Sequence, residues 1–232
     1  MHILASLVAY MNSGDSGSLV LEALSLLPSS SLYDSIVSYS YSGEKKLVYL
    51  SRVEWEFLRE ASLGLVGSSG LFIAGDGLCV FTDGVQKNGV YSGLFVCVLG
   101  RLDRRVLYTS SPPRISRSNP RAVLALYVKR LLSGGIGLEE LATKLVTSGG
   151  GRGAVVFPID YESSGYNLVL VAGTNSYLCI KYRGRSVLSK LGLVEDSSYR
   201  CYSSRVVVFR DLESGIIRIE SKSIEPGKES TS

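Results

Sequence analysis

The residues best suited to bind an anion lie in one stretch of this chain, from residue 101 to residue 121. Its only acidic residue is Asp103, and its basic residues are Arg101, Arg104, Arg105, Arg114, Arg117 and Arg121. A guanidinium group binds phosphate or carboxylate through two parallel hydrogen bonds. Serine and proline between residues 110 and 118 indicate an exposed loop, so Arg114, Arg117 and Arg121 are candidate anion ligands. A solvated basic surface would explain the same residues without any ligand.

Catalytic residues are harder to find. A serine or cysteine triad needs a histidine in the site, and His2 is the only histidine. It precedes the apolar run Ile3–Met11, which predicts a first core strand, so His2 is also explained as a strand-end residue with no catalytic role. Glu139-Glu140 suits the first turn of a helix, where negative charge is favourable. The sequence shows no complete catalytic set and indicates no cofactor.

The cysteines do not indicate a metal site. They are widely spaced and form no CxxC pair, at positions Cys79, Cys97, Cys179 and Cys201. Because they lie in apolar runs, we expect them to be reduced and buried, with a disulfide as the alternative. Cys79 and Cys97 become direct cross-strand neighbours only if their hairpin is centred on Asn88. A turn with Asn88-Gly89 as its two central residues would place them on opposite faces.

Composition limits the class of protein. The chain has 232 residues, of which 45% are hydrophobic and 20% charged, and this excludes global disorder. We expect one α+β domain over residues 1–224 and a frayed tail over residues 225–232. The net charge of +4 is too small for a general nucleic-acid-binding surface, and few aromatic residues interleave with the arginines. Gln86 is the only glutamine, as in some thermophilic proteins, although the Lys/Glu enrichment of such proteins is absent.

We predict no association with a membrane. The run Ile3–Met11 is about half the length that a membrane-spanning helix requires. A secretory signal would place positive charge before this run and a small-residue cleavage site after it, and neither is present. The expected localisation is therefore cytoplasmic.

Caps and apolar periodicity predict four helices. The first runs from Ser16 to Leu27, and the second starts at Ser51, whose spacing to Glu54 matches a capping box, and ends near Gly64. The third has Asn119 as N-cap and Pro120 at the first helical position, and ends at Leu132. The fourth covers Leu138–Thr147.

Alternating and β-rich runs predict strands on both sides of the last two helices. The expected strands are Ile3–Tyr10, Ile36–Ser42, Lys46–Leu50, Leu71–Ala74, Leu78–Thr82, Val90–Leu99, Val106–Thr109, Gly153–Ile159, Tyr166–Val171, Tyr177–Tyr182, Arg205–Arg210 and Gly215–Glu220. A helix pair set between two strand-rich halves differs from strict β-α-β alternation. We therefore expect α+β packing in a layered αββα sandwich, with two mainly antiparallel sheets flanked by helices.

This order of elements resembles class II glutamine amidotransferase domains. The resemblance rests on the capped helix from Asn119, the helix Leu138–Thr147, the strand Gly153–Phe157, and the segments Leu168–Ala172, Tyr177–Ile180 and Tyr202–Val206. It implies the four-layer αββα fold of N-terminal-nucleophile hydrolases. In that family an N-terminal cysteine opens the first strand, and its own amino group acts as the base.

The family's catalytic residues are replaced in this sequence. The nucleophile position is occupied by His2, and Met1 is expected to remain in front of it. The family's Asn-Gly oxyanion segment falls at Leu99-Gly100, without the asparagine. Its acidic substrate-binding residue falls near Ser118 or Asn119, which are the candidate positions for substrate entry. The resemblance therefore implies an inactive relative, and no glutaminase residue carries over.

Two functions of different classes remain open. The first is a non-catalytic glutamine-amidotransferase-like domain that binds or regulates a protein partner. The second is an enzyme with a different site that acts on an anionic small molecule bound by Arg114, Arg117 and Arg121. A pocket that gathers these arginines beside a perturbed acid or base would favour the second.

Overall fold

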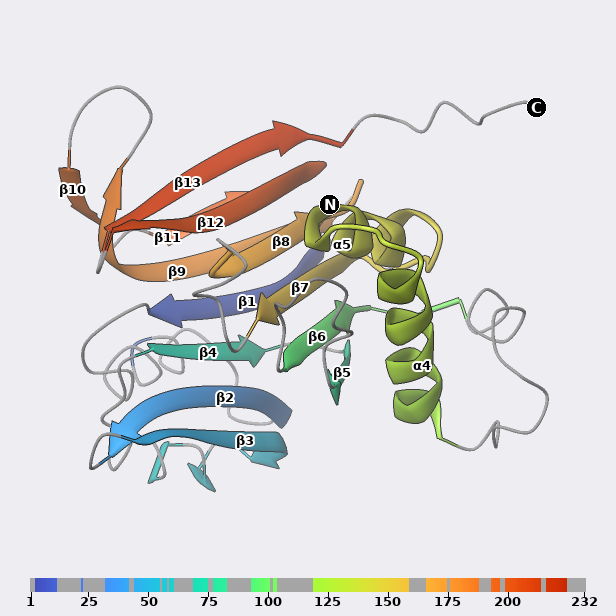
Figure 1. Ribbon diagram of the computed structural model, residues 1–232, viewed down its shortest axis with the longest axis horizontal. Helices are drawn as coiled ribbons and strands as arrows, with labels where there is room; N and C mark the ends of the chain where they lie inside the picture. Colours follow the sequence, from blue (N-terminus) through green and yellow to red (C-terminus); the bar gives the residue numbers. More distant parts are fainter. Residues whose placement is uncertain are drawn as a thin grey trace.

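The computed structural model describes residues 3–11, 22, 32–41, 44–54, 56–57, 59–60, 69–74, 77–82, 93–100, 102–103, 119–158, 166–174, 176–187, 193–196, 199–213 and 216–224. Its strands are β1 (Ile3–Met11), β2 (Leu32–Tyr41), β3 (Glu44–Glu54), β4 (Ser69–Ala74), β5 (Gly77–Thr82), β6 (Leu94–Leu99), β7 (Gly153–Pro158), β8 (Leu168–Ala172), β9 (Ser176–Val187), β10 (Leu193–Asp196), β11 (Tyr199–Tyr202), β12 (Arg205–Glu213) and β13 (Ile216–Ser223). The two long helices are α4 (Pro120–Ser133) and α5 (Leu138–Thr147), which lie together in Figure 1.

One long strand, β9, joins two sheets. Its first part pairs with β1 and β11, and its last part pairs with β10 and β13. The first sheet therefore has the order β3-β2-β4-β1-β9, with β11 on the other side of β9, and the second has the order β9-β13-β12-β8-β7-β6-β5. The described pairs are antiparallel except β1–β9 and β13–β9. The expected α+β class with mainly antiparallel sheets is confirmed.

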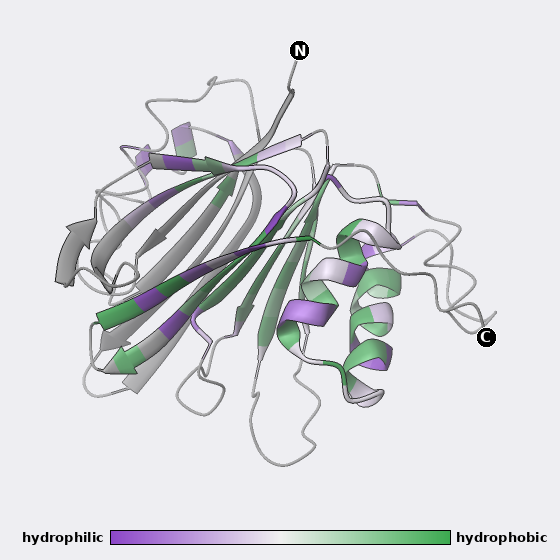
Figure 2. Cartoon of the chain, turned by 90° about the horizontal axis from the view of Figure 1, so that it is seen from above, coloured by the Kyte–Doolittle hydropathy of each residue, from purple (hydrophilic) through white to green (hydrophobic). Residues whose placement is uncertain are grey.

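Two hydrophobic cores lie on the two faces of the second sheet. Leu94, Val96 and Val98 of β6 pack into the core beneath α4 and α5. Their neighbours Phe95 and Cys97 pack into the core toward β4 and β9 of the first sheet. Strand side chains alternate between faces, and every residue of β6 is fully buried because both faces are covered. Figure 2 shows the helices on one side of the sheet.

The helices α4 and α5 begin where their local signals predict. The Asn119 side chain accepts a hydrogen bond from the Ala122 amide at 3.2 Å, and Pro120 occupies the first helical position. The described helix α5 has the predicted bounds, Leu138 to Thr147. No helix among the described residues is long and apolar enough to cross a membrane.

The capping box predicted at Ser51 is wrong. Residues Ser51–Glu54 belong to β3, and Glu54 pairs with Leu32 of β2 across an irregularity near Tyr33. The neighbouring strand supplies hydrogen bonds that a helix cap would otherwise provide, and the described helical residues after β3 begin at Glu56. The strands β10 and β11 were not expected. Most of the predicted first helix, the predicted strand Val106–Thr109 and the tail 225–232 lie outside the described residues.

The prediction of reduced cysteines is also wrong. Cys79 bonds to Cys97 and Cys179 to Cys201, each pair with a Cα–Cα distance of 4.0 Å. Cys79 lies directly opposite Cys97, the register of a hairpin centred on residue 88. Strand pairing places these side chains next to each other, whereas apolar neighbours indicate only burial. Even burial fails for Cys201, which is exposed.

Candidate functional site

In the family that the sequence resembles, the nucleophile lies at the end of the sheets where β1 begins. Ile3, the first residue of β1, pairs with Ser176, the first residue of β9. The Ser176 side chain is buried, and its hydroxyl donates a hydrogen bond of 2.6 Å to the main-chain carbonyl of Arg152. A serine whose proton is held by a carbonyl is not an activated nucleophile, because activation requires a basic group at that position.

Gly100 lies at the same end of the molecule. The Arg152 amide donates to the Leu99 carbonyl at 2.8 Å, which connects the end of β6 to the residue that binds Ser176. Gly100 has a φ of 83°, a left-handed conformation that favours glycine. A Cβ there would also come within 2.9 Å of the Arg152 side chain. The structure thus brings Leu99-Gly100 toward the start of β1, although His2 itself lies outside the described residues.

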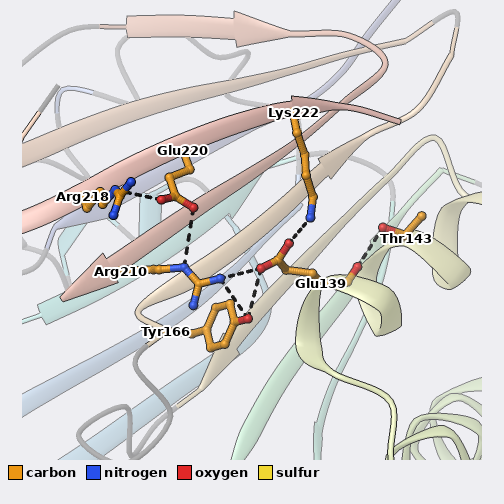
Figure 3. Close-up of polar contacts among 7 residues, drawn as sticks. All are labelled: Glu139, Thr143, Tyr166, Arg210, Arg218, Glu220 and Lys222. Atoms are coloured by element: carbon orange, nitrogen blue, oxygen red, sulfur yellow. Dashed lines mark hydrogen bonds and ion pairs between the residues drawn. The ribbon is translucent and has the colours of Figure 1, made fainter. Parts of the chain in front are cut away.

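A second polar site joins α5 to β12 and β13, and we call it the Glu139 cluster: Glu139, Tyr166, Arg210 and Lys222 (Figure 3). Glu139 Oε1 accepts hydrogen bonds from Arg210 Nη2 at 2.6 Å and from the Tyr166 hydroxyl at 3.0 Å. Lys222 Nζ donates to Glu139 Oε2. The Arg210 guanidinium also lies 3.9 Å from the centre of the Tyr166 ring, a cation–π contact.

The carboxylate of Glu139 is held in its ionised form. Burial works to raise its pKa, but hydrogen bonds from Lys222 and Tyr166, with the charges of Lys222 and Arg210, outweigh burial and lower the pKa below its ordinary value. Both carboxylate oxygens have donors. Such a group is a poor general acid or base near neutral pH, because it neither holds a proton nor accepts one easily. The cluster is therefore best explained as an attachment of α5 to the second sheet.

A third feature is a groove of about 350 Å³ between α4 and β5, here called the α4 groove. It is lined by Cys79, Val80, Phe81, Asn119, Arg121, Ala122 and Ala125. Of the predicted anion ligands, Arg121 lies in this groove, while Arg114 and Arg117 lie outside the described residues. Of the substrate-entry candidates, Asn119 lines the groove and caps α4, and Ser118 is not described.

Sequence reasoning missed most of the Glu139 cluster. Glu139 was explained by its place in the first turn of α5, and this explanation is incomplete because its partners are distant in sequence: Arg210 is 71 residues away and Lys222 is 83. No local motif links such residues. Within the described part of the chain, no group of three His, Cys, Asp or Glu residues could hold a metal ion.

Comparison with known proteins gives a distant structural similarity. No protein-family model matches the sequence, and no curated protein matches it. Glutamine phosphoribosylpyrophosphate amidotransferase from B. subtilis, solved in complex with ADP and GMP, matches 94% of this chain with a TM-score of 0.53 and 12% sequence identity. The match covers 49% of that chain, so this chain spans about half the length of the enzyme. At this identity the likeness shows a shared fold.

Proposed function

We propose that this chain is a glutamine-amidotransferase-like domain that does not hydrolyse glutamine and acts as a binding or partner-regulating module. The observation that carries the proposal is the residue before β1. The fold resembles that of the amidotransferase, β1 lies between β4 and β9 in the first sheet, and His2 stands where a nucleophilic cysteine is expected. An imidazole has no sulfur with which to form the family's thioester, and with Met1 in front of it the amino group that serves as the base is blocked.

Two further positions support loss of glutaminase activity. Leu99 stands where the family has the asparagine that donates to the oxyanion, and its side chain is buried in the core between the sheets. A leucine side chain has no donor for the developing negative charge. Asn119 is used as the cap of α4, so its side-chain oxygen is already hydrogen-bonded to a main-chain amide.

We also infer the full four-layer αββα arrangement. Three layers are formed by α4 with α5, the second sheet and the first sheet. Support for the fourth comes from Glu22, a helical residue whose carboxylate lies 3.3 Å from Lys181 Nζ. Lys181 alternates with Ile180 and Tyr182, which point into the core between the sheets, so it faces the other side of β9.

A glutaminase assay tests the proposed function. Purified protein incubated with glutamine is expected to release no glutamate or ammonia above the buffer rate. His2→Cys is expected to remain inactive as well, because Leu99 and Asn119 still occupy the oxyanion and substrate positions. Circular dichroism of both proteins controls for folding. Glutamate release by the unmodified protein would disprove the proposal.

The alternative is an enzyme that acts on an anionic small molecule held by Arg114, Arg117 and Arg121. One observation favours it, since Arg121 lines a groove. The described residues of that groove include no carboxylate, histidine or free thiol, so a general acid or base would have to come from elsewhere. Under this alternative, Arg121→Gln should abolish turnover of an anionic substrate. Under the first proposal, the unmodified protein has no such activity.

A further inference from the structure

The position of α4 over the second sheet leaves room beside the sheet edge. Among the described strands, β5 pairs only with β6 and so ends the sheet. The sheet strand that α4 chiefly contacts is β5, whereas α5 contacts β7 and β8. A helix with its side chains is about 10 Å wide, and neighbouring strands are about 4.8 Å apart. A helix centred above the last described strand therefore reaches about 5 Å from the axis of that strand, which is about the spacing to one further strand.

The α4 groove lies in that space. Cys79, Val80 and Phe81, which are consecutive residues of β5, all line it. Because consecutive strand side chains point to opposite faces, a groove that touches all three follows the edge of the strand and does not cover one face. The opposite wall is the first part of α4, where Ala122 and Ala125 present small side chains.

The register of β5 shows which peptide groups face this edge. In an antiparallel pair, opposite residues whose Cα atoms are about 4.5 Å apart are not hydrogen-bonded to each other, and those about 5.5 Å apart are. The Cα–Cα distance of Cys79 and Cys97 is 4.0 Å, so this pair is non-hydrogen-bonded. The N–H and C=O groups of Cys79, and of Phe81 two residues later, therefore point away from β6 and toward the groove.

The residues of β5 include none of the side chains that commonly prevent strand addition. Proteins commonly protect edge strands with charged residues or proline, and β5 has the sequence Gly-Leu-Cys-Val-Phe-Thr. Phe81 is 43% exposed, and Leu126 of α4 is 38% exposed. Phe81 lies opposite Phe95 and so on the face of β5 that is turned away from α4, whereas Leu126 belongs to α4 itself, so exposed apolar side chains occur on both faces of this part of the sheet.

We propose that the α4 groove binds an extended segment of a partner protein, which adds to the second sheet as a strand beside β5. Alternate apolar side chains of this segment would pack beneath Ala122 and Ala125. An acidic residue would meet Arg121, the one charged side chain among the described groove residues. This is strand addition, in which main-chain hydrogen bonds give affinity and side-chain pockets give specificity.

The geometry favours a lone segment over a second copy of this chain. In a second copy, α4 lies above β5 as it does here, so a β5–β5 pair would place two helices in the space beside one edge. Packed helices need about 8–10 Å between their axes, about twice the spacing of two strands. The inference rests on the proposed binding role for the existence of a partner, but the groove does not depend on the lost nucleophile.

Peptide selection tests this inference. Phage carrying random dodecapeptides are selected on the intact, oxidised protein, and peptides with alternating apolar residues and an acidic residue are expected. Ala122→Trp, which fills the groove, and Phe81→Lys, which charges its wall, should each weaken a selected peptide by at least about tenfold. Leu212→Lys is the matched control, since Leu212 is 50% exposed on β12 and should leave affinity unchanged.

N-methylation of the selected peptide distinguishes strand addition from other binding. Methyl groups at residues whose N–H faces β5 should each reduce affinity by about tenfold, and methyl groups at the intervening residues should have little effect. Absence of selected peptides, full affinity for both groove variants, or no alternation on N-methylation would each overturn the inference. So would a dimer of the unmodified protein that Phe81→Lys makes monomeric. Glutamine hydrolysis would instead overturn the proposed function and leave the groove intact.

Discussion

Two regions of the second sheet, its β5 edge and its interior strands β12 and β13, are stabilised by different forces. At the β5 edge, the strand is cross-linked to β6 by the Cys79–Cys97 disulfide, in a part of the structure where apolar contacts dominate. On β12 and β13, α5 is attached through the Glu139 cluster, where a carboxylate meets two cations and a phenol. Reductant breaks the disulfide, whereas acid and salt do not. Acid and salt weaken the ionic cluster, whereas reductant does not.

The two regions also differ in the direction of their polar groups among the described residues. In the Glu139 cluster, both oxygens of the carboxylate have such partners, so no binding function is needed to explain it. At the β5 edge, peptide groups and an apolar groove face outward beside a helix. The proposed strand addition therefore concerns the edge, whereas structural stability is sufficient to explain the cluster.

Helix packing stabilises both regions, and its loss should have the largest effect. Leu141 of α5 is fully buried between the helix and the second sheet, and Leu141→Ala should cost about 2–5 kcal/mol of unfolding free energy. Leu126 of α4 is 38% exposed, and Leu126→Ala should change it by less than about 0.5 kcal/mol. Urea denaturation followed by circular dichroism measures both. Equal losses would show that the two leucine side chains are buried to the same extent.

Removing the edge disulfide should have the next largest effect. The double variant Cys79→Ala with Cys97→Ala should lose about 2–4 kcal/mol of unfolding free energy, mostly because the unfolded chain regains conformational entropy. Hydrogen exchange should accelerate more in β5 and β6 than in α5. Mass measurement after alkylation without reductant should find all four cysteines protected in the unmodified protein. Alkylation of Cys79 or Cys97 in that experiment would contradict the cross-link.

Glu139→Gln should lower the free energy of unfolding by about 1–3 kcal/mol at neutral pH, because a part-buried Arg210 loses its charged partner. The pKa of Glu139 is lowered in the folded protein, so its stabilisation is present above the unfolded pKa and lost as pH falls through the folded pKa. The difference between the two proteins should therefore shrink below about pH 4. Glu140→Gln is the control, since Glu140 pairs only with Lys144 among the described residues and is 54% exposed. A constant difference between pH 3 and 7 would contradict the ionic role.

The smallest effect is expected at Glu220. Its carboxylate lies 2.7 Å from Arg218 Nε and 3.8 Å from Arg210 Nε, but all three side chains are partly or largely exposed. Glu220→Gln should change stability by less than about 1 kcal/mol, and added salt should reduce the difference further. Thermal unfolding at low and high salt measures it. A loss as large as that of Glu139→Gln would extend the structural cluster to Glu220.

Features that depend on neighbouring residues could be predicted from the sequence alone. Asn119 and Pro120 specify the start of α4, and the bounds of α5 follow from its apolar periodicity and from the glycines that flank it. Alternation likewise indicated most strands and the α+β class. Such signals succeed because a cap or a strand face is formed within a few residues, and those residues are adjacent in the sequence.

Which distant residues meet depends on the tertiary structure. Ser51 and Glu54 match a capping box, yet strand pairing with β2 overrides it. The disulfides follow from strand register, and a shift of one residue would have placed Cys79 and Cys97 on opposite faces. Glu139 meets Arg210 and Lys222 only because α5 packs across the sheet beside β12 and β13. The α4 groove exists because α4 lies over the last strand, and helix placement depends on packing of the whole core, which no short stretch of sequence encodes.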